Sequence, residues 1–271
     1  MRIAFSKVNG AGNDFILIDN RSGEVDLSPE QVAHLCHRQN GIGADGLILQ
    51  EKSQEKGIDW KWNFYNSDGS SAEMCGNGAR GFARFVKANG SEQRDNFSIG
   101  TIAGVVSASV HEKGITVGLT PPTDQKFDFE LRLEKEILKA DFINTGVPHA
   151  ILFLENEPDS ETIMQLGRRI RYHSEFSPSG TNVNFVTVLG QNHINIHTYE
   201  RGVEGETLAC GTGVSASALA AAKRLGWLSP VKVDVKNGDR LEVGFSQDGE
   251  IFNDVTLTGP AEVIFTGNID I

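Results

Sequence analysis

The sequence contains the segment Cys-Gly-x-Gly twice, about half a chain length apart. The first copy covers 75–78, in "EMCGNGAR", and the second covers 210–213, in "LACGTGVS". The two cysteines are 135 positions apart in a chain of 271 residues, and the same offset places "NGAGNDFILID" (9–19) on "NTGVPHAILFL" (144–154). Self-similarity at a fixed spacing indicates a repeated structural unit. We therefore expect two similar domains.

The segments around the two cysteines share one order of secondary-structure patterns. Alternating apolar residues predict a strand before each cysteine, at 59–66 and 193–200. A helix is predicted after each cysteine, over 78–90 and 213–226, and the latter is rich in alanine and typical of a buried helix.

A β-hairpin is predicted after each of these helices, over 102–120 and 231–245. Both halves therefore have an α+β pattern. We expect an N-terminal domain over 1–120 and a C-terminal domain over 121–259, joined through the proline-containing stretch 119–125.

Composition and charge restrict the partners of the chain. The net charge is -11 and the pI is near 5.1, which argues against nucleic acid, because phosphate binding depends on Lys and Arg. No stretch approaches the roughly 18 apolar residues of a membrane helix, and "MRIAFSKVNG" has no signal-peptide pattern. We expect a cytoplasmic protein with a small-molecule substrate and no membrane partner, assembled as a homodimer.

The segment "GIGADG" (41–46) matches the spacing of the dinucleotide-binding glycines, but its context is reversed. That fingerprint requires a strand before the glycines and a helix after them. Here a helix pattern (28–38) precedes the glycines and the apolar run 47–50 follows them. No nucleotide cofactor is expected from this match.

The cysteine count favours thiols over disulfides. Three cysteines without a C-x-x-C pair give neither a disulfide framework nor a standard zinc pattern. Cys36 and Val32 share one face of the first predicted helix, which indicates burial in a core. His34, Cys36 and His37 match no standard metal spacing, so no metal and no other cofactor is expected.

The other two cysteines have a setting that favours chemistry. Glycine next to Cys75 and Cys210 allows a sharp turn and close approach of a ligand to main-chain N–H groups. A helix that starts there leaves its first N–H groups available and carries partial positive charge, which attracts an anion and lowers the pKa of a thiol.

Two such thiols at equivalent points of two domains suit one reaction. If they faced each other across an interdomain cleft, one thiolate would remove a proton from a carbon and the other thiol would return a proton to the opposite face. That exchange racemises or epimerises a stereocentre, and the two thiols would titrate as a coupled pair.

At these residues the sequence resembles the diaminopimelate epimerase family along most of the chain. The matching segments are "GNDF" (12–15), "GIGADG", "NSDGSSAEMCGNGAR" (66–80), "GVPHA" (146–150), "TNVNF" (181–185) and "YERGVEGETLACGTG" (199–213). The resemblance implies two pseudo-symmetric domains, each a central helix wrapped by β-structure, with a last strand (260–271) that joins the first domain. It also implies epimerisation of LL- and meso-2,6-diaminopimelate without pyridoxal phosphate, on the route to lysine and peptidoglycan.

The resemblance also implies roles for individual residues. Cys75 and Cys210 would be the acid and base, and His149 and Glu200 would adjust their pKa values as charged neighbours. The substrate would be bound by the remaining residues of the motifs: Asn13, Asn66, Gly76, Asn77, Asn182, Glu200, Arg201, Gly211 and Thr212. Among these, Gly76, Asn77, Gly211 and Thr212 would offer main-chain N–H groups, and Thr212 its hydroxyl, to the carboxylate at the reacting carbon.

The chain departs from the family pattern at two positions, and other classes of protein remain possible. Val147 stands where many members have Asn, and Gly46 where some have Gln. A proline racemase or hydroxyproline epimerase would share the two cysteines but typically has His at the position of Asn77. A dithiol redox protein, or a binding module that leaves the α-hydrogen in place, are the alternatives of other classes.

Overall fold

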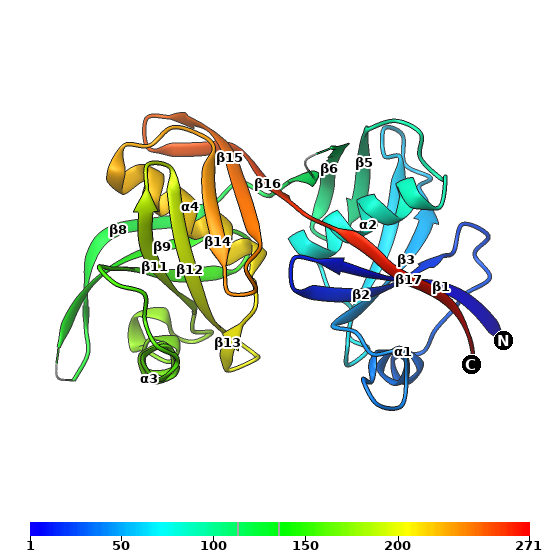
Figure 1. Cartoon of the computed structure of the whole chain (residues 1–271), viewed down its shortest axis with the longest axis horizontal. Helices are drawn as coiled ribbons and strands as arrows, with labels where there is room; N and C mark the ends of the chain where they lie inside the picture. Colours follow the sequence, from blue (N-terminus) through cyan, green and yellow to red (C-terminus); the bar gives the residue numbers. More distant parts are fainter. Residues whose placement is uncertain (113, 135) are drawn as a thin grey trace. The chain divides into compact units, whose positions relative to one another are not determined.

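The computed structural model describes residues 1–112, 114–134 and 136–271, and in it the chain divides into two compact units (Figure 1). Unit 1 consists of residues 1–118 together with 259–271, and unit 2 consists of residues 119–258. The C-terminal segment therefore belongs to the same unit as the N-terminus.

Unit 1 is a sheet that surrounds one helix. Its elements are β1 (Arg2–Gly10), β2 (Asn13–Asp19), α1 (Pro29–Cys36), β3 (Gly46–Lys52), β4 (Trp60–Asn66), α2 (Gly76–Ala88), β5 (Asn96–Thr101), β6 (Gly104–His111), β7 (Gly114–Gly118) and β17 (Glu262–Asp270). Strand β1 pairs antiparallel with both β17 and β2. From β2 the sheet continues through β3, β4, β5 and β6 to β7, and the pairs β2–β3 and β4–β5 are parallel.

Unit 2 is built in the same way. Its elements are β8 (Thr123–Arg132), β9 (Ile137–Asn144), β10 (Pro148–Leu154), α3 (Ser160–Arg171), a 3-10 turn (Ser174–Phe176), β11 (Asn182–Gly190), β12 (His193–Glu200), β13 (Gly205–Thr207), α4 (Gly211–Leu225), β14 (Val231–Val235), β15 (Arg240–Asp248) and β16 (Ile251–Gly259). Strand β9 pairs with β8 and β10, and the order continues through β11, β12, β14 and β15 to β16.

The two units repeat the same series of strand directions. From β9 to β16 the successive pairs are antiparallel, parallel, antiparallel, parallel, antiparallel and antiparallel, as they are from β1 to β7. Helix α4 lies in the chain between the strands of the second parallel pair of unit 2, as α2 does in unit 1. The predicted fold class, α+β with two pseudo-symmetric halves, is confirmed.

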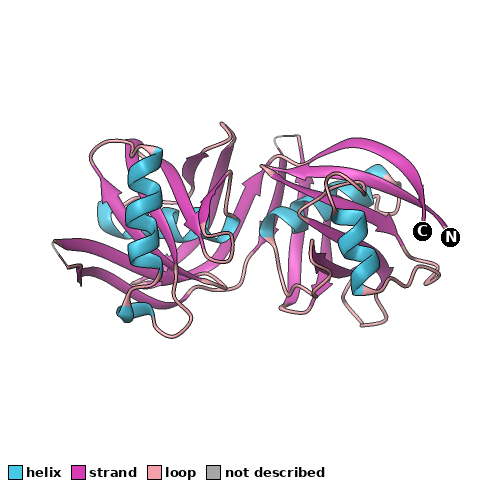
Figure 2. Cartoon of the chain, turned by 90° about the horizontal axis from the view of Figure 1, so that it is seen from below, coloured by secondary structure: helices cyan, strands magenta, loops and turns pink. Residues whose placement is uncertain are grey.

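Helices α2 and α4 occupy the centres of their units (Figure 2). Helix α2 contacts β1, β2, β3, β6, β7 and β17, and α4 contacts β9, β10, β11, β12, β14 and β15. In α4 every residue from Gly213 to Ala222 is buried, and this run consists mainly of alanine, serine and valine. Small side chains allow strands to approach the helix from several directions, which explains why the sequence shows little amphipathic pattern there.

The predicted strands and hairpins are present, and both helices begin earlier than expected. They start at Gly76 and Gly211, directly after each cysteine, because the glycines adopt helical geometry once the cysteine acts as N-cap. The "GIGADG" segment runs from a loop into β3 after α1, so no helix follows its glycines. None of the helices in the described ranges has the length and apolar character of a membrane span.

Candidate active site

Cys75 is the N-cap of α2. Its backbone is extended (φ -147°, ψ 118°), and its Sγ accepts a hydrogen bond from the N–H of Gly78 at 3.3 Å. A Cβ at Gly78 would lie 3.3 Å from the Cys75 Cβ and 3.6 Å from its Sγ, so glycine leaves room for the sulfur beside the first helical turn. The thiol therefore occupies the place of a serine or threonine cap, where positive partial charge favours the thiolate.

Cys210 is the N-cap of α4, at the equivalent point of unit 2. Its backbone is also extended (φ -125°, ψ 107°), but its Sγ makes no cap hydrogen bond to the helix. The sulfur instead lies 3.4 Å from the hydroxyl oxygen of Thr212. The predicted position of both cysteines at helix starts is confirmed, and the two sulfurs differ in the group that contacts them: a main-chain N–H for Cys75 and a hydroxyl for Cys210.

Asn13 and Asn77 form part of a hydrogen-bonded chain in unit 1. The buried guanidinium of Arg80 donates to Asn77 Oδ1 (2.7 Å), and Asn77 Nδ2 donates to Asn13 Oδ1 (2.7 Å). Asn13 Nδ2 then donates to a carboxylate oxygen of Asp45 (3.0 Å), which Arg38 holds through its other oxygen (2.7 Å). Because the chain begins at an obligate donor and ends at an obligate acceptor, the orientation of both amides is fixed.

The same part of unit 1 contains an ion-pair cluster. Burial alone would raise the pKa of Asp14, but hydrogen bonds and charge from Arg38 and Lys7 lower it to about 2. Asp14 contacts Lys7 at 2.8 Å and Arg38 at 2.8 Å, and its main-chain N–H donates to Asp45. The residue next to Asn13 is thus an ionised anchor for the start of β2.

Asn66 and Gly46 lie opposite each other in the β3–β4 pair. The Asn66 amide donates to the hydroxyl of Ser70 (3.0 Å) at the turn after β4. A Cβ at Gly46 would lie 2.7 Å from the ring of Phe64 and 2.7 Å from the carbonyl oxygen of Tyr65. A side chain at position 46 would therefore collide with β4 unless Phe64 and the β4 backbone shifted.

His149 is a fully buried side chain of β10. Burial, and then the charge of Arg201, lower its pKa to about 3, so the ring is neutral at neutral pH. Its Nε2 lies 2.9 Å from the Thr212 hydroxyl, and its Nδ1 lies 3.0 Å from Asn184 Nδ2. His149 is therefore connected to Cys210 through Thr212, by hydrogen bonds and not by a charge of its own.

Asn182 and Arg201 lie together in unit 2. Asn182 faces His149 across the parallel β10–β11 pair, and its Oδ1 accepts from the main-chain N–H of Arg201 at 2.8 Å. The Arg201 guanidinium donates to the carbonyl of Ser179 (3.4 Å), and Glu200 ends β12 immediately before it. A cavity of about 550 Å³ in unit 2 has Pro148 and Ser179 in its lining, the two residues whose carbonyls these side chains contact, but none of the predicted site residues lines it.

Within each unit, the structure brings most of the predicted residues together. Unit 1 contains Cys75, Gly76, Asn77, Asn13 and Asn66, and unit 2 contains His149, Asn182, Glu200, Arg201, Cys210, Gly211 and Thr212. Side chains that sequence reasoning missed include Asp45, Arg80 and Asn184, which contact Asn13, Asn77 and His149, and Thr198, which contacts Asn184. For Asn184 a signal existed, since two asparagines two apart in the apolar strand "TNVNF" share one face.

No group of three or more His, Cys, Asp or Glu side chains within the described ranges is arranged to hold a metal ion. Cys36 is buried in the core of unit 1, as predicted, and burial raises the pKa of its thiol to about 12.

Comparisons of the sequence with known proteins identify a single family. The family model described as diaminopimelate epimerase matches residues 5–123 and 142–264. A diaminopimelate epimerase of Aquifex aeolicus (strain VF5) is 42% identical over 276 residues, covering 98% of this chain and 97% of that protein. One from Archaeoglobus fulgidus is 40% identical over 283 residues, covering 98% and 96%.

Solved structures resemble the fold at low sequence identity. A Bacillus anthracis phenazine biosynthesis protein of the PhzF family matches with a TM-score of 0.75 at 15% identity, covering 100% of both chains. A hydroxyproline epimerase from Agrobacterium vitis matches with a TM-score of 0.71 at 17% identity, covering 99% of this chain and 92% of that one. At these identities the likeness concerns the fold.

Proposed function

Since this chain belongs to the diaminopimelate epimerase family, we propose that it interconverts LL- and meso-2,6-diaminopimelate with two thiols and no pyridoxal phosphate. The chain is an amino-acid epimerase, an isomerase. The observation that supports the two-thiol mechanism is the repetition of one device: a cysteine N-caps the central helix of each topologically equivalent unit.

In this mechanism one cysteine is a thiolate and the other a thiol. The thiolate takes the α-hydrogen as a proton, and the C–H electron pair stays on the carbon. The opposite thiol then gives its proton to the other face of that carbon, so the configuration inverts and the proton count is unchanged. The reverse reaction exchanges the roles of Cys75 and Cys210. The mechanism requires the two sulfurs to reach opposite faces of a single stereocentre.

Each helix start would also stabilise charge on the substrate. Main-chain N–H groups of Gly76, Asn77, Gly211 and Thr212 would bind the carboxylate at the reacting carbon, where negative charge develops as the proton leaves. The distal amino-acid group would be bound by the remaining residues, with Arg201 on its carboxylate, Glu200 on its ammonium, and amides of Asn13, Asn66 and Asn182.

Deuterium exchange tests this function. The reduced protein, incubated with diaminopimelate in deuterated water without pyridoxal phosphate or metal, should exchange the α-hydrogen, as followed by proton NMR. Cys75→Ala and Cys210→Ala should each abolish epimerisation. Cys36→Ala is the matched control, because this third thiol is buried in α1 with a pKa of about 12. Turnover at the wild-type rate in either of the first two variants would refute the two-thiol mechanism.

Substrate choice is tested in the same assay. Proline and trans-4-hydroxyproline are the substrates of the nearest rival function, and we expect no α-hydrogen exchange with either. Asn77 supports this expectation, since the rival class typically has His at this position; here the Asn77 side chain accepts from Arg80 and donates to Asn13.

We further propose that the enzyme works in the cytoplasm as a homodimer. Both reacting cysteines must stay reduced, which a reducing compartment ensures. Strand β17 presents Ile264 and Phe265 to solvent, 56% and 48% exposed, which supports a contact with a second copy of the chain. Sedimentation equilibrium should give a dimer, and Phe265→Asp should shift it towards monomer. A monomeric wild-type protein would contradict the assembly.

A further inference from the structure

The Thr212 hydroxyl lies between the only two partners that the described contacts give it, His149 Nε2 (2.9 Å) and Cys210 Sγ (3.4 Å). A hydroxyl has one proton, so it can donate to one of them and must accept from the other. If it donates to the sulfur, it stabilises the thiolate; if it donates to the imidazole, that stabilisation is lost. The direction therefore depends on which nitrogen of His149 carries the ring proton.

His149 is neutral and fully buried, so it has one ring proton and its hydrogen-bond partners select the tautomer. Its Nδ1 faces Asn184 Nδ2 at 3.0 Å. An amide NH₂ group only donates, so Nδ1 must accept, and the proton lies on Nε2. His149 then donates to Thr212, and the Thr212 proton points to Cys210.

The Asn184 amide must have its nitrogen on the side of His149 for this direction to hold, and two features on the other side favour that orientation. The Thr198 hydroxyl donates to Asn184 Oδ1 at 2.8 Å. The same oxygen lies beside Gly213 in the first turn of α4, 2.6 Å from where a Cβ would stand, and the partial positive charge there favours an oxygen over an NH₂ group.

Thr212, near the other end of this hydrogen-bonded series, is also held in position. Thr145 donates its hydroxyl proton to the main-chain carbonyl of Thr212 (2.9 Å), which fixes the residue at the start of α4. Of the charged residues, Arg201 acts on His149 through its charge, and Glu200 ends the strand that carries Thr198.

We propose that Asn184 is a positioning residue of the epimerase: by donating to His149 Nδ1 it sets the direction of a hydrogen-bonded chain, Asn184 to His149 to Thr212 to Cys210, that delivers a donor to the Cys210 sulfur. This deepens the function proposed above and rests on it only in assigning a use to Cys210. The chain favours the thiolate, the form that removes the α-proton.

The alkylation rate of Cys210 as a function of pH tests the proposal without turnover. The protein is used in a Cys75→Ala background, and iodoacetamide labelling of Cys210 is followed by mass spectrometry. Cys36 does not interfere, because burial raises the pKa of its thiol to about 12. Asn184→Asp replaces the donor by an obligate acceptor of the same shape, so the ring proton moves to Nδ1 and Thr212 donates to Nε2. The midpoint of alkylation should rise by about one to two pH units.

Two further variants distinguish the effect of hydrogen-bond direction on the alkylation midpoint from the effect of the added negative charge. Asn184→Leu removes the donor without a charge and should raise the midpoint by a smaller amount. Asn195→Asp is the matched control. Asn195 lies in β12 of the same unit, and its Nδ2 is 3.3 Å from His197 Nε2. The substitution therefore places the same new carboxylate beside another histidine. It should leave the midpoint unchanged.

Nitrogen-15 NMR of histidine-labelled protein reads the tautomer directly. We expect His149 Nδ1 to be unprotonated in the wild type and protonated in Asn184→Asp. A protonated Nδ1 in the wild type, or an Asn184→Asp midpoint equal to that of wild type, would overturn the proposal. Loss of α-hydrogen exchange in Cys210→Ala tests the proposed function separately, so the two can fail independently.

Discussion

Single residues near the reactive cysteines determine how closely neighbouring side chains can pack. Gly213 follows the Cys210 cap by three positions, and its missing side chain makes room for Asn184 Oδ1 and for His149 Cε1, which would lie 2.6 and 3.2 Å from a Cβ. Both neighbours are fully buried and cannot move into solvent. The second glycine of Cys-Gly-x-Gly is therefore required by packing, since its backbone is helical and has no positive φ.

Gly213→Ala should displace this pair and lower the free energy of unfolding by about 1–3 kcal/mol, with a loss of epimerase activity. Gly205→Ala is the control within unit 2, because a Cβ at that position would have no atom within 4 Å and the φ of Gly205 is not positive. Urea unfolding and the α-hydrogen exchange assay give the two readouts. Equal stability of the two variants would show that the clearance at Gly213 is unimportant.

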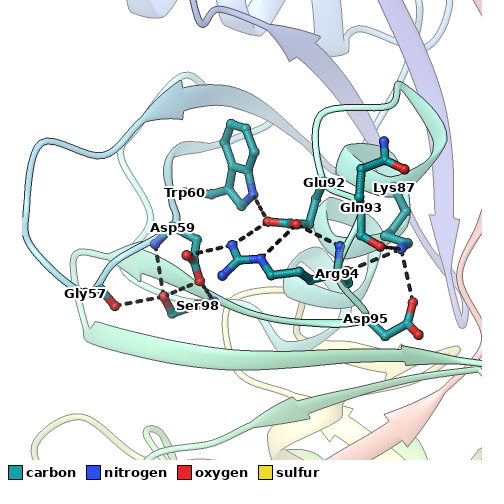
Figure 3. Close-up of polar contacts among 9 residues, drawn as sticks. All are labelled: Gly57, Asp59, Trp60, Lys87, Glu92, Gln93, Arg94, Asp95 and Ser98. Carbon is teal, nitrogen blue, oxygen red and sulfur yellow. Dashed lines mark hydrogen bonds and ion pairs between the residues drawn. The ribbon is translucent and has the colours of Figure 1, made fainter.

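Glu92 is the centre of a polar cluster in unit 1 that is separate from the cysteine (Figure 3). The Arg94 side chain donates to it (2.8 Å), the indole of Trp60 donates to it (3.2 Å), and Arg94 also contacts Asp59 (2.7 Å). The hydrogen bonds from Arg94, opposed by burial and aided by Trp60, lower the pKa of Glu92 to about 2. This cluster joins the end of α2 to the paired strands β4 and β5.

Because the folded-state pKa of Glu92 lies below its unfolded value, its contribution to stability is present above about pH 4.5 and is lost as pH falls towards 2. Glu92→Gln should therefore lower the free energy of unfolding at pH 7 by roughly 1–2 kcal/mol, since the exposed Arg94 is screened by solvent. The difference from wild type should vanish near pH 2, as measured by urea unfolding at several pH values. A difference that persisted at that pH would contradict the ionic origin.

At the scale of the element, α2 and α4 differ in what caps them. The Cys75 sulfur accepts from the Gly78 N–H, while the Cys210 sulfur makes no such bond to its helix. The N-terminal turn of α2 is thus stabilised by the group that is proposed to react.

Cys75→Ser should retain the cap, and Cys75→Ala should lose it, so the serine variant should be more stable by about 1 kcal/mol although both are inactive. The same two substitutions at Cys210 serve as control and should differ less. Thermal unfolding of the four variants gives the comparison. A serine variant of Cys75 no more stable than the alanine variant would mean that the sulfur does not cap α2.

The elements predicted from the sequence are those determined by local patterns. Glycine next to Cys75 and Cys210 indicated helix starts, and alternating apolar residues indicated β4 and β12, because both signals act within a few residues. The link from Asn184 to His149 joins residues 35 positions apart, which become neighbours only when β10 and β11 pair in parallel. A polar residue such as Asn184 in an apolar strand indicates that its side chain needs a hydrogen-bond partner, but the sequence does not identify that partner.

At the scale of the whole molecule, β17 completes unit 1 from the far end of the chain (Figure 1). It pairs with β1 from Arg2↔Asp270 to Asn9↔Glu262, and the main-chain N–H of Ile271 donates to the carbonyl of Met1 (2.9 Å). The side chains of Arg80 and Arg84 in α2 donate to the carbonyls of Pro260 and Ala261 just before this strand. The last residues therefore hold both the sheet and the central helix of unit 1.

Deletion of 259–271 should loosen unit 1 and leave the core of unit 2 intact. Hydrogen exchange followed by mass spectrometry should show lost protection in β1 and α2 and retained protection in β11 and α4. Uniform loss across both units would contradict the division of the chain, and full protection of α2 would show that its contacts with the C-terminal segment are dispensable.

The placement of β17 also reverses the order in which the two halves can be completed. Unit 2 is one continuous segment, so all of its strands are translated before the last strand of unit 1. Until β17 is made, one edge of β1 in unit 1 stays unpaired, whereas unit 2 already has all the strands that pack around its helix. Chaperone engagement during synthesis is expected to concentrate on the part of the chain that was made first.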